Sequence, residues 1–193
     1  MGGTFNPIHL GHLRSAEEIL EKEKLDKIIF ITSFNPPHKN AKIIPFYIRK
    51  EMVKSAIQDN PNFIQFEIEE EIEGFSYTYQ TLNKLSSHFP KASLFFIMGA
   101  DNISQLENWK KPKEIIKLAK IIITNRPGFS LDKNYELIMK YPDRFVFCAI
   151  TDLAISSTKI RECLAENLSV RYLVPENVNI LIDRYKDEIL SVY

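Results

Sequence analysis

The stretch Gly2-Gly3-Thr4-Phe5-Asn6-Pro7-Ile8-His9-Leu10-Gly11-His12 decides how the rest of the chain is arranged. Its leading glycines permit a turn that a side chain would obstruct, and Pro7 stiffens the loop. An amphipathic segment follows, so the loop runs into the start of a helix, where backbone amides and the helix dipole attract an anion. Gly11 lets a phosphate approach the backbone, and His9 and His12 add imidazole donors. We therefore predict a phosphate-binding loop.

Composition bounds the class of protein. The chain has 193 residues, of which 45% are hydrophobic and 26% charged, with a net charge of zero. These values are typical of one globular domain, which we expect to span residues 1–193. They imply no broad attraction to nucleic acid or to a membrane surface. No apolar run has the length of a membrane span, and the two cysteines form no metal-type spacing, so we expect a reduced, cytoplasmic protein.

Apolar runs alternate with segments of helical periodicity along the whole chain. This alternation predicts an α/β fold with a doubly wound, mainly parallel sheet. Ligands of such sheets bind beyond the carboxyl ends of the strands, so the candidate site lies in the loops 33–40, 99–109, 125–128 and 151–158. The predicted strands are 28–31, 63–66, 94–98, 121–124 and 145–147. The predicted helices include 46–58, 78–88, a helix capped by 156–158 and a final helix opened by Pro175. The acidic segment 67–73 is predicted to be a sheet edge.

The segment Ser156-Ser157-Thr158-Lys159-Ile160-Arg161 places hydroxyl groups and backbone amides at a helix start. Arg161 follows one turn along, and a guanidinium can bind two phosphate oxygens in a planar fork. The alternative is an ordinary N-cap with a surface arginine.

Four further features have both a functional and a structural interpretation. Pro36-Pro37-His38-Lys39 is a stiff loop that ends in two cations, or an ordinary turn. Asp101 follows a buried strand, where a carboxylate can accept ribose hydroxyl hydrogen bonds or cap a helix. Trp109, the only tryptophan, is a ring platform or a core residue. The segment 76–81 precedes a helix. It either binds a ligand at the start of that helix or only caps it.

Two of these motifs, GGTFNPxHxGH and ISSTxIR, resemble those of the nucleotidyltransferase superfamily, which transfers AMP or CMP from a nucleoside triphosphate. Together with PPHK, SYTxxTL, GADN with a downstream tryptophan, and RPG, they resemble the bacterial nicotinate-nucleotide adenylyltransferase family over nearly the whole chain. The resemblance implies a Rossmann-like fold. It also implies transfer of AMP from ATP to nicotinate mononucleotide, giving nicotinate adenine dinucleotide and pyrophosphate, with Mg²⁺ bound with ATP.

The resemblance also implies the roles of individual residues, with no residue assigned to a metal. Catalytic roles fall to His9, His12 and Arg161. ATP would be bound by Gly3, Thr4, Phe5, His12, Lys39, Ser157, Thr158 and Arg161. The mononucleotide would be bound by Thr78, Asp101, Trp109, Lys110 and Arg126. In this scheme Asp101 binds ribose, Trp109 stacks on the pyridine ring, and Thr78 with amides near Lys110 receives the carboxylate.

The residue pattern also bears on mechanism. No serine, cysteine or lysine is placed with a base as an activated nucleophile. The mononucleotide phosphate is already a nucleophile, so the site has only to align it with the α-phosphorus of ATP and neutralise charge.

The chain departs from the family at three places. The family usually has Pro-Asn after the second strand, where this chain has Thr32-Ser33. The residue after the tryptophan is often tyrosine, where this chain has Lys110. Asn6 replaces the commoner aspartate.

Other functions stay open at this stage. Pantetheine-phosphate adenylyltransferase and glycerol-phosphate cytidylyltransferase share the first and last motifs, but SYTxxTL and Trp109 argue against them. A nicotinamide-mononucleotide adenylyltransferase differs only in the amide or carboxylate end of its substrate. A non-catalytic nucleotide-binding regulator is disfavoured by the intact His9, His12 and Arg161. The expected partners are these small-molecule substrates, and whether the protein is a homo-oligomer is left open.

We also expect the first strand to be truncated in this chain. Only Met1 precedes Gly2-Gly3, whereas a strand needs about five or six residues. Burying four or five more large apolar side chains would stabilise the fold by on the order of 10 kcal/mol. We therefore predict an apolar run upstream of Met1, lost through a misplaced initiation codon or trimming. The intact mass of the protein from its own source tests this, and a mass that matches Met1 in a stable, active enzyme would refute it.

Overall fold

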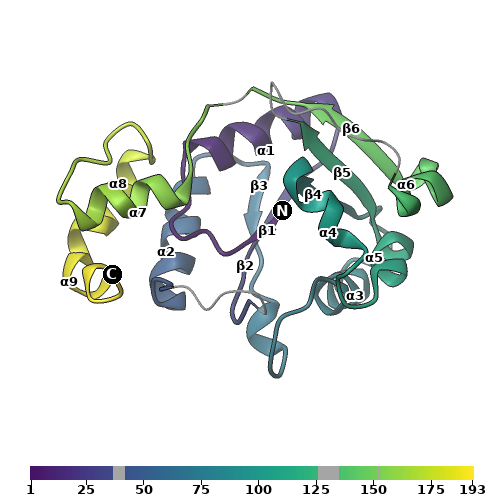
Figure 1. Cartoon of the computed structure of the whole chain (residues 1–193), viewed down its shortest axis with the longest axis horizontal. Coiled ribbons are helices and arrows are strands. Elements are labelled where there is room, and N and C mark those ends of the chain that lie inside the picture. Colours follow the sequence, from purple (N-terminus) through teal and green to yellow (C-terminus); the bar gives the residue numbers. More distant parts are fainter. Residues whose placement is uncertain (37–41, 126–134, 152) are drawn as a thin grey trace.

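The computed structural model describes residues 1–36, 42–125, 135–151 and 153–193, in which strands and helices alternate as predicted (Figure 1). The strands are β1 (Gly2–Gly3), β2 (Ile28–Thr32), β3 (Phe63–Gln65), β4 (Phe95–Gly99), β5 (Lys120–Asn125) and β6 (Phe145–Ala149). The helices are α1 (Leu10–Lys22), α2 (Phe46–Ile57), α3 (Thr78–His88), α4 (Ile103–Leu106), α5 (Pro112–Leu118), α6 (Glu136–Lys140), α7 (Ser157–Ala165), α8 (Glu176–Arg184) and α9 (Lys186–Leu190). Short 3₁₀ turns occupy Glu69–Glu71, Ala100–Asn102 and Pro142–Arg144.

The strands form two parallel three-stranded sheets, in the orders β1-β2-β3 and β4-β5-β6. The expectation of a doubly wound parallel α/β fold is thus confirmed, with the sheet in two halves. The strand β1 consists of Gly2 and Gly3. They pair with Ile31 and Thr32, and among the described residues no ladder joins β1 to β4.

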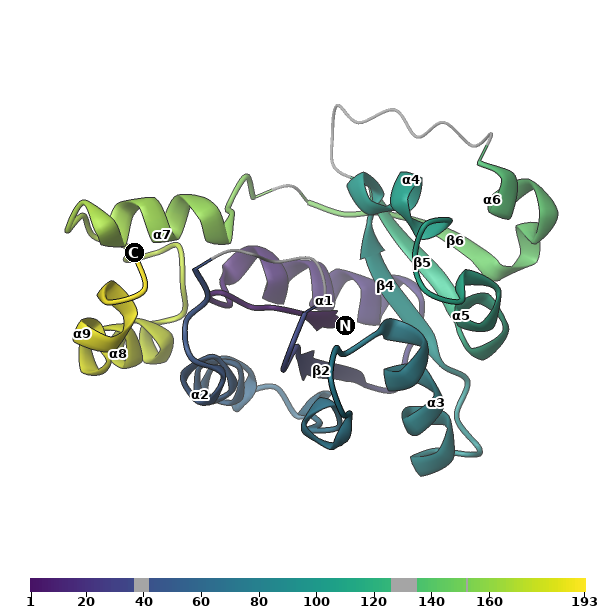
Figure 2. The ribbon, with the colours of Figure 1, turned by 60° about the horizontal axis from the view of Figure 1, so that its bottom comes forward.

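Side chains alternate between the two faces of the strands, and each face is covered by its own helices. Phe30 and Ile122 point into a core made with α1, α2 and the C-terminal helices. Their neighbours Ile31, Ile121 and Ile123 point into a second core made with α3 to α6. Figure 2 shows α7, α8 and α9 together at one end of the molecule, with the sheet β4-β5-β6 at the other.

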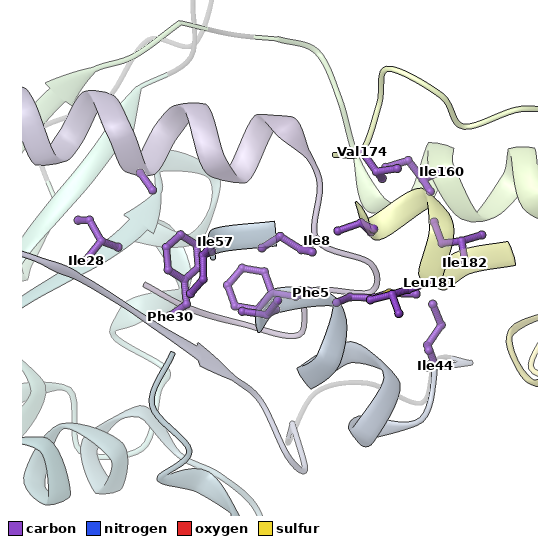
Figure 3. Close-up of a cluster of buried hydrophobic side chains, with 14 of the residues drawn as sticks. Phe5, Ile8, Ile28, Phe30, Ile44, Ile57, Ile160, Val174, Leu181 and Ile182 are labelled. Atoms are coloured by element: carbon purple, nitrogen blue, oxygen red, sulfur yellow. The ribbon is translucent and has the colours of Figure 1, made fainter. Parts of the chain in front are cut away.

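The first core anchors the predicted phosphate loop (Figure 3). Phe5 and Ile8 are buried in it, and the Phe5 ring lies 5.9 Å from that of Phe30 between centroids. The same core contains Ile160 of α7 and Leu181 of α8, which come from the far end of the sequence. The loop is therefore fixed by its own apolar side chains, and the C-terminal helices pack against it.

Two sequence expectations need correction. The acidic segment 67–73 is no sheet edge: it forms the 3₁₀ turn at 69–71, and Glu69 is buried because its carboxylate accepts hydrogen bonds from Phe34 and Thr81. The single final helix is two helices that meet at Tyr185, whose hydroxyl donates to Glu51 of α2 at 2.7 Å. Within the described residues, no helix combines the length and apolar character needed to cross a membrane.

A buried carboxylate ties α1 to the loop after β6. Glu18 is 4% exposed and accepts hydrogen bonds from Arg14 at 2.8 Å, Lys22 at 2.9 Å and the backbone amide of Thr151 at 3.2 Å. These bonds, those from Thr151 and Lys22 above all, lower the pKa of Glu18 to about 2. Because Thr151 lies just before the hydroxyl-rich start of α7, this contact helps to place α7.

We expect Glu18→Gln to lower the free energy of unfolding at pH 7 by about 1.5–3 kcal/mol, the usual contribution of a hydrogen bond to a charged group. The folded-state pKa is depressed from 4.5 to about 2, so this stability is present above pH 4.5 and is lost as pH falls toward 2. Urea unfolding at pH 7 and at pH 3 measures it, with Glu21→Gln on the exposed side of α1 as control. A difference between wild type and Glu18→Gln that does not shrink in acid would contradict this origin.

Candidate active site

A cavity of about 1440 Å³ lies between the two sheets, lined by β2, β4 and the loops after β1, β4 and β6. Every predicted site residue within the described parts of the chain lines it, and Lys39 and Arg126 lie outside those parts. The lining residues that the sequence had singled out are Gly3, Thr4, Phe5, His9, His12, Thr78, Asp101, Trp109, Lys110, Ser157, Thr158 and Arg161.

The two histidines pack on each other at the start of α1. Their rings are stacked with centroids 3.7 Å apart, and the Phe5 ring is nearly perpendicular to that of His12, with centroids 5.1 Å apart. The backbone amide of His9 donates to Nδ1 of His12 at 3.2 Å. Because Nδ1 accepts, a neutral His12 carries its proton on Nε2 and can donate from there.

The backbone around the histidines is more specialised than the sequence indicates. A side chain on Gly11 would meet the His9 ring at 3.0 Å, so this glycine makes room for an imidazole as well as for a ligand. The amide of Leu10 is already used, because it donates to the carbonyl of Leu173 at 3.0 Å. Within the described residues the amide of Gly11 has no such partner, and it lines the cavity. Fewer α1 amides are therefore available to an anion than a bare helix start would offer.

Asn6 is a structural residue of the loop and is 4% exposed. Its Oδ1 accepts from the amide of Ile44 at 2.9 Å, and its Nδ2 donates to the carbonyl of Lys42 at 3.3 Å. An aspartate could only accept at both places. The asparagine side chain therefore joins the phosphate loop to the segment before α2 through both its oxygen and its nitrogen.

The start of α7 closes over the phosphate loop from the other end of the chain. Ser156 is the N-cap, as predicted, and accepts from the amide of Lys159 at 3.1 Å. Ser157 Oγ donates to the carbonyl of Pro7 at 2.9 Å, and Arg161 Nη1 donates to the carbonyl of Asn6 at 3.0 Å. Arg161 Nη2 also donates to Thr158 Oγ1 at 3.1 Å. The guanidinium is therefore held at the loop before any ligand binds.

Asp101 lies in the 3₁₀ turn that follows β4, exposed on the wall of the cavity. A Cβ on the preceding Gly99 would come within 2.3 Å of Asp101 Oδ1. The carboxylate can lie where it does only because residue 99 has no side chain.

The loop 109–111 and the start of α3 form the other end of the cavity. Trp109 is half-buried, with its ring edge-on to Phe96 at 6.0 Å, so it is both a packed residue and a cavity wall. Lys110 Nζ lies 4.3 Å from the ring centroid of Tyr77. Thr78, the first residue of α3, follows Tyr77 directly. A cation, an aromatic ring and a helix N-terminus therefore meet at one place.

Sequence reasoning missed two buried charged residues: Glu69, which lines the cavity, and Arg49, which bonds to the loops around it but does not line it. Arg49 donates to Thr4, 45 residues away, and Glu69 accepts from Phe34, 35 residues away, so no local pattern identifies these contacts. Arg49 lies on the buried face of α2, whose other buried residues are apolar. A charged residue among apolar neighbours was the signal in the sequence that could have identified it.

The fold and the loop arrangement define a class, the cytidylyltransferase-like proteins, whose family model matches residues 1–163. Among relatives, a Clostridium acetobutylicum protein named "Probable nicotinate-nucleotide adenylyltransferase" is 42% identical over 190 residues, which cover 96% of this chain and 95% of the relative. A Clostridium perfringens protein of the same name is 41% identical over 95% of this chain and 94% of the relative. The chain therefore belongs to the nicotinate-nucleotide adenylyltransferase family.

Solved structures agree on the fold. The structure "Plasmodium falciparum nicotinic acid mononucleotide adenylyltransferase complexed with NaAD" superimposes with a TM-score of 0.79 at 21% identity, covering 100% of this chain and 97% of the other. The same protein complexed with APC gives a TM-score of 0.76 at 20% identity, covering 100% of this chain and 96% of the other.

We expect His12→Ala to lower kcat by ~10²–10³, the usual cost of removing a donor aimed at charge that develops in the transition state. Steady-state turnover measures this. The control is His12→Gln, because glutamine at the third helical position also accepts from the N-cap amide. It should restore the stability of α1 without restoring the imidazole, and near-normal turnover in His12→Ala would make His12 an ordinary capping residue.

Proposed function

We propose that this protein transfers AMP from ATP to nicotinate mononucleotide, giving nicotinate adenine dinucleotide and pyrophosphate, and that residues 1–193 act as one nucleotidyltransferase domain. Family membership supports the reaction. The observation that carries it is that one cavity is bounded by a phosphate loop at one end and by an aromatic and cationic pocket at the other. Two anionic nucleotides could lie in it end to end.

On the phosphate side, the residues neutralise and orient charge. His12 offers Nε2–H, Arg161 offers a guanidinium fixed by Asn6 and Thr158, and Gly11 offers a backbone amide. All are set before substrate arrives, and preorganised donors of this kind stabilise developing charge most effectively. The nucleophile is the phosphate of the mononucleotide, so alignment of the two substrates takes the place of an activated side chain.

Divalent metal enters with the triphosphate in this proposal. Within the described residues, no cluster of three or more His, Cys, Asp or Glu could hold a metal. Mg²⁺ keeps several waters and commonly binds through substrate phosphates. The available donors therefore fit a cation held mainly by ATP, where it would neutralise phosphate charge.

On the pyridine side, charge favours the carboxylate over the amide form. Lys110 Nζ lies over Tyr77, beside the N-terminus of α3, and both features attract an anion. Trp109 provides an aromatic face at the same end of the cavity. Nicotinate mononucleotide carries a carboxylate that these groups can receive, whereas the amide form has an uncharged carboxamide at that position. Lys110 stands where the family often has tyrosine, so this chain adds a charge to the pocket.

We predict that kcat/KM is higher for nicotinate than for nicotinamide mononucleotide. We also predict that Lys110→Met lowers it about tenfold for the acid and hardly at all for the amide, because one charge-assisted interaction contributes about 1.5 kcal/mol. Lys111→Met is the matched control: its ammonium lies over Tyr79, 4.7 Å from the centroid, and Lys111 does not line the cavity.

A wild-type enzyme that prefers the amide would refute the substrate assignment. An equal loss with both mononucleotides in Lys110→Met would assign Lys110 to packing instead. The cytoplasmic location and the roles of Lys39 and Arg126 stay predictions from the sequence.

A further inference from the structure

Arg49 on α2 is 2% exposed, and it joins three segments of backbone. Its Nε donates to the carbonyl of Ile44 at 2.8 Å. Its Nη1 donates to the carbonyl of Thr4 at 2.7 Å and to that of Ser33 at 2.9 Å. Thr4 lies in the phosphate loop, and Ser33 follows β2. The planar guanidinium therefore fixes these two loops to each other.

Glu69 makes the corresponding connection on the other side. It is 7% exposed, and its Oε2 accepts from the amide of Phe34 at 3.1 Å. Its Oε1 accepts from the hydroxyl of Thr81 at 3.0 Å. Thr81 belongs to α3, whose first residue is Thr78. Burial raises the pKa of Glu69, and these hydrogen bonds act in the opposite direction. Burying this carboxylate therefore has a desolvation cost, which the hydrogen bonds partly offset.

The two residues bind opposite ends of the same peptide group. The carbonyl of Ser33 and the amide of Phe34 belong to one peptide bond, so a cation holds its oxygen and an anion its N–H. A continuous chain of hydrogen bonds thus runs from Thr4 through Arg49, this peptide group and Glu69 to Thr81. Its ends lie on the phosphate side and the pyridine side of the cavity.

Stability alone is a poor explanation for such a chain, because two buried charges pay a desolvation penalty that apolar side chains of similar size would avoid. Alignment of the two substrates is a better explanation. Reacting atoms must approach to about 3–3.5 Å, and a shift of about 1 Å can cost ~10² in rate. A rigid connection between the two halves of the cavity sets this separation.

We propose that Arg49 and Glu69 are positioning residues that hold the two substrate half-sites at the distance the transfer requires, by clamping the Ser33–Phe34 peptide group. This rests on the proposed function. Neither residue has to touch substrate: Arg49 does not line the cavity, and both oxygens of Glu69 accept hydrogen bonds from the protein.

The test compares kcat with the separate affinities for the two substrates. Arg49→Lys keeps the charge, but its single nitrogen cannot stand at both positions that Nε and Nη1 of the planar guanidinium occupy. Glu69→Leu removes both acceptors. We expect kcat to fall about tenfold to a hundredfold in each variant, with the Kd of a non-reactive ATP analogue and that of nicotinate mononucleotide each within about threefold of wild type. Because both belong to one chain of contacts, the double variant should lose little more than either single one.

Glu69→Gln is the conservative control. Its Oε1 can accept from Phe34 while its amide donates to the Thr81 hydroxyl, so it should restore most of kcat. If Glu69→Leu or Arg49→Lys does not fold, Thr81→Val breaks the same chain without removing a charge. Ser87→Ala, at an exposed hydroxyl on α3, is its control. Thr81→Val should lower kcat and Ser87→Ala should not.

Several results would overturn the proposal: wild-type kcat in Arg49→Lys and Glu69→Leu, additive losses in the double variant, or losses found in Kd instead of kcat. Hydrogen exchange of the Phe34 amide, which needs no turnover, should accelerate in Arg49→Lys if the clamp is real. Absence of wild-type turnover with nicotinate mononucleotide would instead refute the proposed function, and unchanged Phe34 exchange would refute the clamp separately.

Discussion

Two hydrogen bonds from α7 to the carbonyl groups of Asn6 and Pro7 hold the two ends of the sequence together at the cavity. They come from Arg161 at 3.0 Å and Ser157 at 2.9 Å. Together with the burial of Ile160 in the first core, they fix the hydroxyl-rich start of α7 relative to the histidines of α1. Because both acceptors are backbone carbonyls, the contact depends on the path of the loop, which Phe5 and Ile8 secure in the core.

That path carries local strain. Phe5 has φ of 45°, in the left-handed region that residues other than glycine seldom adopt, and such a conformation costs on the order of 1 kcal/mol. The core contacts of its ring with Phe30 offset this cost. The Phe5 ring also packs nearly perpendicular to the His12 ring. One residue therefore connects the packing of the first core to the orientation of a site histidine.

Local signals were sufficient for most of the fold. The helix from Thr78 to His88 was predicted with its observed bounds, because its apolar period and its start are both encoded within eleven residues. The N-cap at Ser156 was equally local. The predicted site residues converged because loops after parallel strands meet at one edge of the sheet.

The rest depended on contacts between distant residues. Glu69 stands in an acidic run, a pattern typical of a solvent-exposed edge. Hydrogen bonds from Phe34, 35 residues away, and from Thr81, 12 residues away, make it a buried acceptor instead. The availability of α1 amides was overestimated because Leu173, far along the chain, already accepts from Leu10. The family resemblance had placed Thr78 and the amides near Lys110 together, but the contact of the Lys110 ammonium with the Tyr77 ring has no local signal in the sequence.

The pair Gly99 and Asp101 has a consequence for how this family can diverge. Any side chain at position 99 would displace the Asp101 carboxylate, since its Cβ would stand 2.3 Å from Oδ1. The displaced group is the end of an exposed side chain, so such a change would spare the fold and re-aim the carboxylate. Selection on the carboxylate thus acts on the glycine two residues before it. A lineage that no longer needs an aspartate at 101 would be free to lose the glycine at 99, and the two positions should drift together.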